Sequence, residues 1–279
     1  PIANDIDPWG SYMFEKGKMT SGFGRSIDNQ LRTLGMRDLK TQVDEIEVFI
    51  YNSNGWHPYE IEEKGMSSLS ASEISIKLKA FSNSSLPANR RLNWGGNFSA
   101  FERNETWTFL ADGTIKLEQE IIPHGPMPDM LQKVGLQFQL PKAFDNVEWY
   151  GRGPFETYPD RKTGAKVGIY NSNDDEIFEP YIIPQEYGNR TDVRWLKVQN
   201  EDGKGLLIKG DELINFSLHK FSTDNLSRAM YLYQLEESQN TILNVDYEVS
   251  GVGGTAIRQL QKYRVKPGIR KYRLSIKPF

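Results

Sequence analysis

The sequence contains no cysteine and only three histidines among its 279 residues. The lack of cysteine excludes disulfides, thiolate nucleophiles and metal sites that use cysteine ligands. His57, His124 and His219 lie far apart in the chain, and none of them has a partner at a metal-ligand spacing such as H-x-x-x-H. We therefore expect no metal ion and no cofactor in this chain.

Neither charge sign dominates, because 34 Lys and Arg stand against 37 Asp and Glu, which gives a formal net charge of −3. A nucleic-acid-binding protein usually carries a basic surplus on one face, so we expect no nucleic-acid partner. No apolar run approaches the roughly 20 residues of a membrane-spanning helix, and there is no polybasic patch, so we expect no membrane partner. The composition predicts a soluble protein and is compatible with both the cytoplasm and the periplasm.

The sequence is rich in the alternation of apolar and polar residues that is typical of half-buried β-strands. From Glu73 to Phe81 it reads EISIKLKAF, and the same pattern returns in VGLQFQL (134–140) and INFSL (214–218). In the last run, His219 follows Leu218 on the face opposite the core, which predicts a solvent-exposed strand histidine. Twenty-four glycines and 14 prolines are scattered along the whole length and supply turns between strands.

Three segments predict β-hairpins: Asp112-Gly113, the run from Glu201 to Gly205, and Pro267-Gly268 each separate two strand-like runs. Helical signal is weak and is confined to Ser26–Leu39, where Gly35 is unfavourable, and to Asp224–Leu235. The chain is therefore predicted to be all-β, a large antiparallel β-sandwich of two stacked sheets. We expect residues 1–279 to form a single domain.

The densest functional pattern is VEWYGRGPFETYPDR, residues 147–161. Glycines and prolines end a strand here and impose a defined path on polar side chains. An aromatic face, carboxylates and guanidinium groups together are what a sugar site requires. A buried network of arginines and carboxylates that fixes a loop is an equally good interpretation.

A second dense pattern is PQEYGNRTDVRW, residues 184–195. Two such loops lying close together would form the floor of a polar cleft, and Glu156 and Glu186 resemble the paired carboxylates of a glycosidase. Arg161 and Arg194 each stand beside an aspartate, so we expect both to be mainly architectural. Loss of one member of a buried ion pair is strongly destabilising, and we therefore expect Arg161→Ala to destabilise the protein strongly.

These patterns closely resemble the C-terminal domain, or small chain, of family 2 glycoside hydrolases that are beta-galactosidases. The first family motif is W-x-G-x-G-P-x-E-x-Y-x-D-R, and it runs from Trp149 to Arg161. The second is P-x-E-x-G-N-R-x-D-V-R-W, from Pro184 to Trp195, and the third is D-x-x-x-x-G-V-G-G, from Asp246 to Gly254. Pro1, Asn4 and Asp5 match the end of the motif that opens this domain.

The resemblance implies a supersandwich, the galactose mutarotase-like fold shared with aldose epimerases. It implies that the parent enzyme hydrolyses terminal non-reducing β-D-galactose residues with two glutamates. In the family both glutamates lie in a central barrel domain outside this chain, so the chain helps to shape the sugar cleft and is not itself catalytic. Any Mg²⁺ or Na⁺ of the parent enzyme is expected in those other domains, and the parent is expected to be a homo-oligomer.

The resemblance also implies which residues reach the substrate. Residues 1–24 lead into the domain and supply a cleft loop with Trp9, while the turn after G-V-G-G has Thr255 to Arg258 where the family has a stacking tryptophan. The candidate substrate-binding residues are Trp9, Arg152, Glu156, Asp160, Glu186, Asn189, Arg190 and Arg258. The alternative is a free-standing aldose epimerase-like or carbohydrate-binding protein, and an epimerase would require a histidine and a glutamate that converge on the concave face.

Overall fold

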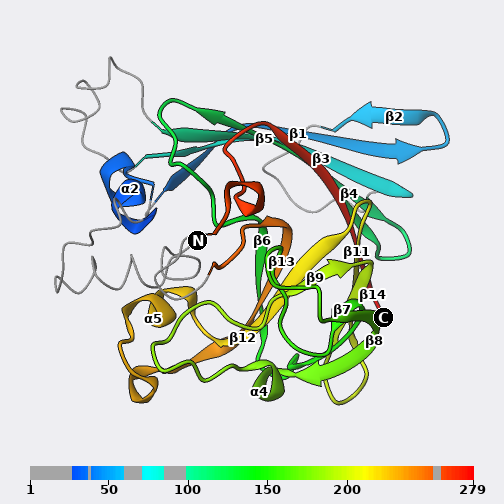
Figure 1. Cartoon of the computed structure of the whole chain (residues 1–279). Coiled ribbons are helices and arrows are strands. Elements are labelled where there is room, and N and C mark those ends of the chain that lie inside the picture. The colour runs from blue at the N-terminus through cyan, green and yellow to red at the C-terminus, as the bar shows by residue number, and fades with distance from the viewer. Residues whose placement is uncertain (1–26, 37–38, 60–70, 85–98, 254–258) are drawn as a thin grey trace.

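The computed structural model describes residues 27–36, 39–59, 71–84, 99–253 and 259–279. Strands form most of this part of the chain (Figure 1). Their bounds are β1 Lys40–Asn52, β2 Gly55–Pro58, β3 Glu73–Asn83, β4 Ala100–Leu110, β5 Ile115–His124, β6 Lys133–Pro141, β7 Asn146–Gly153, β8 Lys166–Asn173, β9 Arg190–Val193, β10 Trp195–Gln199, β11 Gly205–Gly210, β12 Ile214–Phe221, β13 Glu237–Val249 and β14 Arg270–Pro278. The helices are short: α2 Ile27–Leu34, α4 Asp174–Ile177, α5 Thr223–Arg228, and the 3₁₀ turns η2 Leu232–Gln234 and η3 Gln261–Tyr263.

The strands form two antiparallel sheets. The large sheet has ten strands in the order β2-β1-β3-β4-β5-β14-β11-β10-β7-β8, and the small sheet has four in the order β6-β13-β12-β9. In Figure 1 the large sheet curves over the small sheet, and the β1–β2 hairpin is its outermost part. The prediction of an all-β antiparallel sandwich is confirmed.

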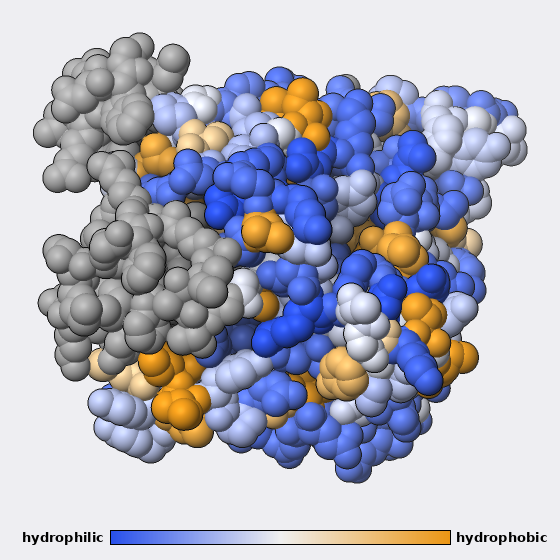
Figure 2. Space-filling model, in the orientation of Figure 1, coloured by the Kyte–Doolittle hydropathy of each residue, from blue (hydrophilic) through white to orange (hydrophobic). Residues whose placement is uncertain are grey.

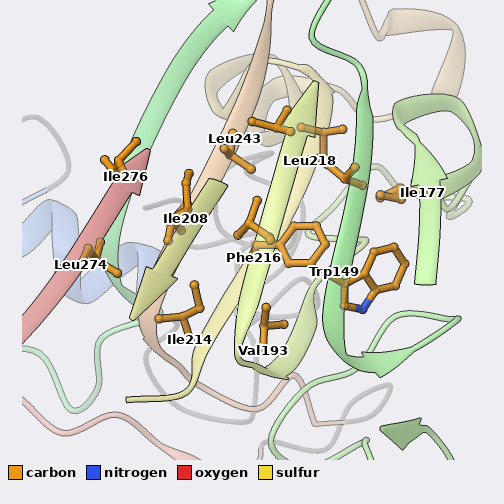
Figure 3. Close-up of a cluster of buried hydrophobic side chains, with 14 of the residues drawn as sticks. Trp149, Ile177, Val193, Ile208, Ile214, Phe216, Leu218, Leu243, Leu274 and Ile276 are labelled. Atoms are coloured by element: carbon orange, nitrogen blue, oxygen red, sulfur yellow. The ribbon is translucent and has the colours of Figure 1, made fainter. Parts of the chain in front are cut away.

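The hydrophobic core fills the space between the two sheets (Figure 3). The alternation predicted for β6 and β12 sends every second residue inward, and Ile214, Phe216 and Leu218 are almost completely buried. They face the large sheet, where the Trp149 ring lies edge-on to the Phe216 ring with 5.5 Å between the ring centroids. Burial of apolar side chains at this depth contributes roughly 1.5–3 kcal/mol for each large residue.

A smaller apolar cluster closes the end of the sandwich next to α2. Leu31 and Leu34 pack there with Met36 and Met130. The helix ends at Leu34, because Gly35 takes a φ of +65° that favours glycine and stops the helix. The predicted helix is therefore present over Ile27–Leu34 and does not extend to Leu39.

Two of the three predicted hairpins are confirmed, one joining β4 to β5 around Gly113 and the other joining β10 to β11 around Gly203. The hairpin at Pro267-Gly268 was a wrong prediction. Only β14 follows that turn as a strand, while Val265 before it forms an isolated bridge with Leu131 and donates its N–H to Ser250 Oγ at 2.9 Å. The segment before the turn is thus bonded to a loop instead of to β14. The second predicted helical segment, Asp224–Leu235, contains α5 and η2.

The surface visible in Figure 2 is largely hydrophilic over the described residues, with separate hydrophobic patches. No helix among the described residues is long and apolar enough to cross a membrane.

Candidate functional site

The first two motifs meet at the ends of β7 and β9, above the buried ring of Trp149. The indole N–H of Trp149 donates to the carbonyl oxygen of Arg152 at 2.9 Å, which fixes the end of β7. The guanidinium of Arg190 stacks over the same ring, 5.3 Å from its centroid. Trp149 therefore anchors both motifs on the core instead of presenting its face to solvent.

Arg152 forms an ion-paired cluster with Asp192 and Lys162. Its Nε lies 2.5 Å from Asp192 Oδ2, Lys162 Nζ lies 2.7 Å from Asp192 Oδ1, and the guanidinium also donates to the carbonyl of Ala165 at 2.8 Å. Burial alone would raise the pKa of Asp192, but the hydrogen bonds from Lys162 and Arg152 outweigh it and lower that pKa. Asp192 has a φ of +56°, a strained conformation that this cluster holds in place.

Both carboxylate oxygens of Glu156 are occupied by donors from the chain itself. Oε1 accepts from the guanidinium of Arg161 at 3.0 Å and from the hydroxyl of Tyr181, and Oε2 accepts from the backbone N–H of Gly188 at 2.9 Å. The first motif is thereby connected to the start of the second. The Glu156 carboxylate has three hydrogen bonds to keep it in place.

Asn189 and Arg190 are buried and bond to backbone groups. The Asn189 amide donates to the carbonyl of Thr157 at 2.8 Å, and Arg190 donates to the carbonyl of Gly188 at 3.0 Å. Burial lowers the pKa of Arg190 to about 10, so it stays charged at neutral pH. Its Nε has no hydrogen-bond partner within the part of the chain that the structure describes.

Asp160 connects the first motif to the third. Its Oδ1 accepts from the backbone N–H of Val252 at 3.1 Å, and its Oδ2 accepts from the N–H of Gly253 at 2.8 Å. A Cβ at Gly251 would lie 2.5 Å from the carboxylate carbon of Asp160, so only glycine allows this approach. The G-V-G-G sequence therefore packs directly on the aspartate of the first motif.

Arg161 and Arg194 lie at the edge of this network. The Arg161 side chain is 54% exposed, so the prediction that it forms a buried pair is wrong. A pair with that exposure is screened by solvent and contributes at most about 1 kcal/mol. Arg194 donates to the carbonyl of Asp192 and stacks over the Tyr150 ring, which fits its predicted architectural role.

Glu186 faces away from this network, toward the outer side of the small sheet. Its carboxylate is almost fully buried, and Oε1 lies 2.7 Å from Lys133 Nζ and 3.5 Å from the hydroxyl of Tyr158. Lys133 Nζ also lies 4.0 Å from Asp246 Oδ2. Glu186, Lys133 and Asp246 thus form a buried cluster of mixed charge.

This cluster lies in a pocket of about 190 Å³ on the outer face of the small sheet, which we call the outer-face pocket. Strand register explains why its residues meet: Gly135 is opposite Asp246, and Gln137 is opposite Asn244, which is opposite Ser217. Side chains two residues apart on a strand share a face, so these rows form a polar floor. The polar side chains that line the pocket are Lys133, Gln137, Glu186, His219, Thr223, Asn244 and Asp246.

Burial dominates the electrostatics of the outer-face pocket. It raises the pKa of Asp246 to about 7 and also raises that of Glu186, while the positive charge of Lys133 acts in the opposite direction on both. Burial lowers the pKa of His219 to about 3. His219 lies opposite the core as predicted, but the prediction that it is exposed to solvent is wrong: the Tyr187 ring stacks on it at 4.3 Å, and 2% of it is exposed.

Sequence reasoning missed Lys133, Gln137 and Asn244 as site residues. The available signal was the polar residues at every second position of β6, β12 and β13, on the face opposite the core. Trp9 and Arg258, like all of residues 1–24, lie outside the described residues. Within the described ranges no group of three or more His, Cys, Asp or Glu side chains is placed to hold a metal ion.

The three motifs bond to one another on an all-β sandwich, and its small sheet carries a polar pocket. Residues 13–277 match the family model described as "Beta galactosidase small chain". The chain belongs to this family, and its predicted resemblance is confirmed.

Curated relatives named beta-galactosidase match about half of the chain. The protein of Priestia megaterium is 41% identical over 149 residues, and that of Vibrio cholerae is 37% identical over 148 residues; both matches cover 53% of this chain. The matched segment spans 14% of the length of each of these relatives. This domain is therefore a small part of a much longer chain in those proteins.

Among solved structures, a GalM/aldose epimerase homologue from C. elegans aligns with 74% of this chain and 65% of its own, at 9% identity and a TM-score of 0.37. A likeness of that size supports no conclusion on function.

Proposed function

We propose that this chain is the non-catalytic C-terminal domain of a beta-galactosidase, a longer protein that hydrolyses terminal non-reducing β-D-galactose residues. The observation that carries the proposal is the match to the small-chain family over residues 13–277, together with the small share of the beta-galactosidase relatives that the chain spans. In this proposal the remaining domains supply the two catalytic glutamates and any Mg²⁺ or Na⁺.

The bonding of the motif carboxylates supports a non-catalytic role. A retaining glycosidase needs a nucleophilic carboxylate and an acid/base carboxylate about 5–5.5 Å apart, both facing the sugar. The carboxylates of Glu156, Asp160 and Asp192 each accept hydrogen bonds on both oxygens from donors in the same chain. Glu186 is paired with Lys133. These groups are committed to holding the loops together.

The test compares the full-length protein with the 279-residue chain on a chromogenic β-galactoside. We expect turnover by the full-length protein and none by the chain alone. Glu156→Gln and Glu186→Gln in the isolated chain are the matched variants. Turnover by the isolated chain that either variant abolishes would contradict the non-catalytic role.

The proposal also covers contacts with the substrate and with other copies of the protein. In this proposal Trp9 and Arg258 contribute to the sugar cleft, so Trp9→Ala and Arg258→Ala in the full-length protein are expected to raise KM without lowering the melting temperature. The other substrate contacts proposed are Arg152, Glu156, Asp160, Asn189 and Arg190 in the network, and Glu186, which lies outside it. The parent protein is proposed to be a homo-oligomer, which sedimentation of the full-length protein tests.

A further inference from the structure

The outer-face pocket offers hydrogen-bond donors and acceptors side by side. Glu186 and Asp246 supply carboxylate oxygens, and Lys133 supplies an ammonium group. Gln137 donates to the Asn244 side-chain oxygen at 2.9 Å and to the Thr223 hydroxyl at 3.1 Å, so the amides form a connected floor. A hydroxyl group both donates and accepts, and it suits a pocket of this mixed kind.

The charge of the pocket selects against ions. A divalent cation would meet the ammonium group of Lys133 within the same cluster, and an anion would meet the Glu186 carboxylate that is paired with it. Like charges at such separations in a buried site are strongly unfavourable. A neutral ligand avoids both conflicts.

The shape of the pocket limits the ligand to about one ring. Its volume of about 190 Å³ is below the roughly 300–1,000 Å³ of pockets that hold drug-sized ligands. Glu186, His219 and Asp246 are buried at its base, whereas Gly135 and Gln137 are exposed at its mouth. Leu226 of α5 adds an apolar wall, which a sugar ring contacts through its C–H groups.

Two polar atoms at the base have no hydrogen-bond partner among the described residues, namely His219 Nδ1 and Asp246 Oδ2. His219 Nε2 lies 3.0 Å from the carbonyl oxygen of Tyr187, which requires the ring proton on Nε2 and leaves Nδ1 as an acceptor. Buried polar atoms without partners are rare and point to a missing ligand or water.

We propose that the outer-face pocket is a binding site for a neutral monosaccharide or a terminal sugar residue of the same size. The sugar hydroxyls bond to Glu186, Asp246 and His219 Nδ1, and the ring lies against Leu226. The site belongs to this chain alone, and it does not depend on the hydrolytic activity proposed for the longer protein.

The test uses crystals of the full-length protein soaked in galactose, glucose or myo-inositol. Difference density is expected between Gln137 and Glu186. A concentration series gives the occupancy of this pocket by itself, so the result stays separate from binding at any other sugar site. Gluconate and glucosamine are the charged counterparts and are expected to bind at least about tenfold more weakly, which corresponds to about 1.4 kcal/mol.

Variants at the mouth and the floor locate the site. Gln137→Trp, at an exposed position, is expected to block the pocket and weaken binding at least about tenfold. Asn244→Leu removes an amide of the floor at similar volume and is expected to act in the same direction. Gln139→Trp is the matched control, because Gln139 is also exposed on β6 but does not line the pocket, and it is expected to bind as the unmodified protein does.

Three results would overturn the proposal. The first is no density for any neutral probe in the outer-face pocket, including the case in which sugar appears only elsewhere. The second is tighter binding of gluconate or glucosamine than of glucose. The third is unchanged occupancy in Gln137→Trp, which changes an exposed position and is informative even where Asn244→Leu does not fold.

Discussion

Replacing Asp246 with asparagine is expected to change how the stability of the domain depends on pH. Asp246 is buried beside Lys133 and Glu186, and it lines the outer-face pocket together with His219. Burial raises the pKa of Asp246 from its ordinary 3.8 to about 7 in the folded chain. Asparagine has nearly the same shape as the protonated acid and does not titrate.

The sign of this pH dependence follows from whether the folded or the unfolded state holds the proton on Asp246. Between pH 4 and pH 7 the folded state keeps Asp246 protonated and the unfolded state does not, so this contribution is fully present below pH 4 and is lost as pH rises through 7. Each pH unit in that range changes the free energy of unfolding by about 1.4 kcal/mol. From pH 5 to pH 8 the unmodified protein should therefore lose about 3 kcal/mol that Asp246→Asn keeps.

His219 titrates in the opposite sense and must be separated from this effect. Its pKa is lowered to about 3 from its ordinary 6.5, so its contribution is present above pH 6.5 and is lost as pH falls toward 3. That contribution is the same in both proteins and cancels in their difference. Burial raises the pKa of Glu186 in both proteins as well.

The measurement is urea unfolding of the 279-residue chain and of Asp246→Asn at pH 5, 6, 7 and 8. Hydrogen exchange of β12 and β13 in the full-length protein gives the same comparison in the intact molecule. The expected result is a variant that becomes more stable relative to the unmodified protein as pH rises. A difference in stability that stays constant from pH 5 to pH 8 would refute the reasoning.

Two further predictions concern the motif network. Gly251→Ala places a Cβ 2.5 Å from the Asp160 carboxylate carbon and is expected to lower the free energy of unfolding, measured in urea, by about 1–3 kcal/mol. The control is Gly164→Ala, whose Cβ would have its nearest neighbour 3.9 Å away and which should be nearly neutral. Equal effects of the two substitutions would contradict the assigned packing. Arg161→Ala should lower the free energy of unfolding by at most about 1 kcal/mol, because the Arg161–Glu156 pair is exposed. Arg190→Ala removes a buried stacking partner of Trp149 and should lower it by about 2 kcal/mol or more. A melting temperature that falls further in Arg161→Ala than in Arg190→Ala would refute this order.

Local patterns predicted the sheets well because strand signals are short-range. The alternation in β6 and β12 placed Ile214, Phe216 and Leu218 on the core face, and the glycine turns gave two of three hairpins. The failure at Pro267-Gly268 has a non-local cause. Val265 bonds to Leu131, which is 134 residues earlier in the chain, and to Ser250, which is 15 residues earlier, so no local rule contains those partners.

The motif residues themselves were visible in the sequence, but their partners were not. Spacing alone left a sugar site and an ion-paired loop as equal interpretations of residues 147–161. The structure shows the hydrogen bonds that connect the motifs: Glu156 bonds to Gly188 and Asp160 bonds to Gly253. The glycines of the second and third motifs thus serve as backbone donors to carboxylates of the first. The substrate-binding role of these residues stays a prediction.

The outer-face pocket shows why a buried polar site is harder to predict than a core. Apolar residues at alternate positions have one physical meaning, since they bury against another layer. Polar residues at alternate positions have two possible meanings, because they form either a solvent-exposed face or the floor of a pocket that another segment covers. The pocket arises because a loop distant in sequence brings Glu186 onto Lys133 and Tyr187 onto His219. Once that loop covers the sheet, side chains that the strand pattern assigns to solvent become a buried, mixed-charge set, and this change in surroundings gives the small sheet a site of its own.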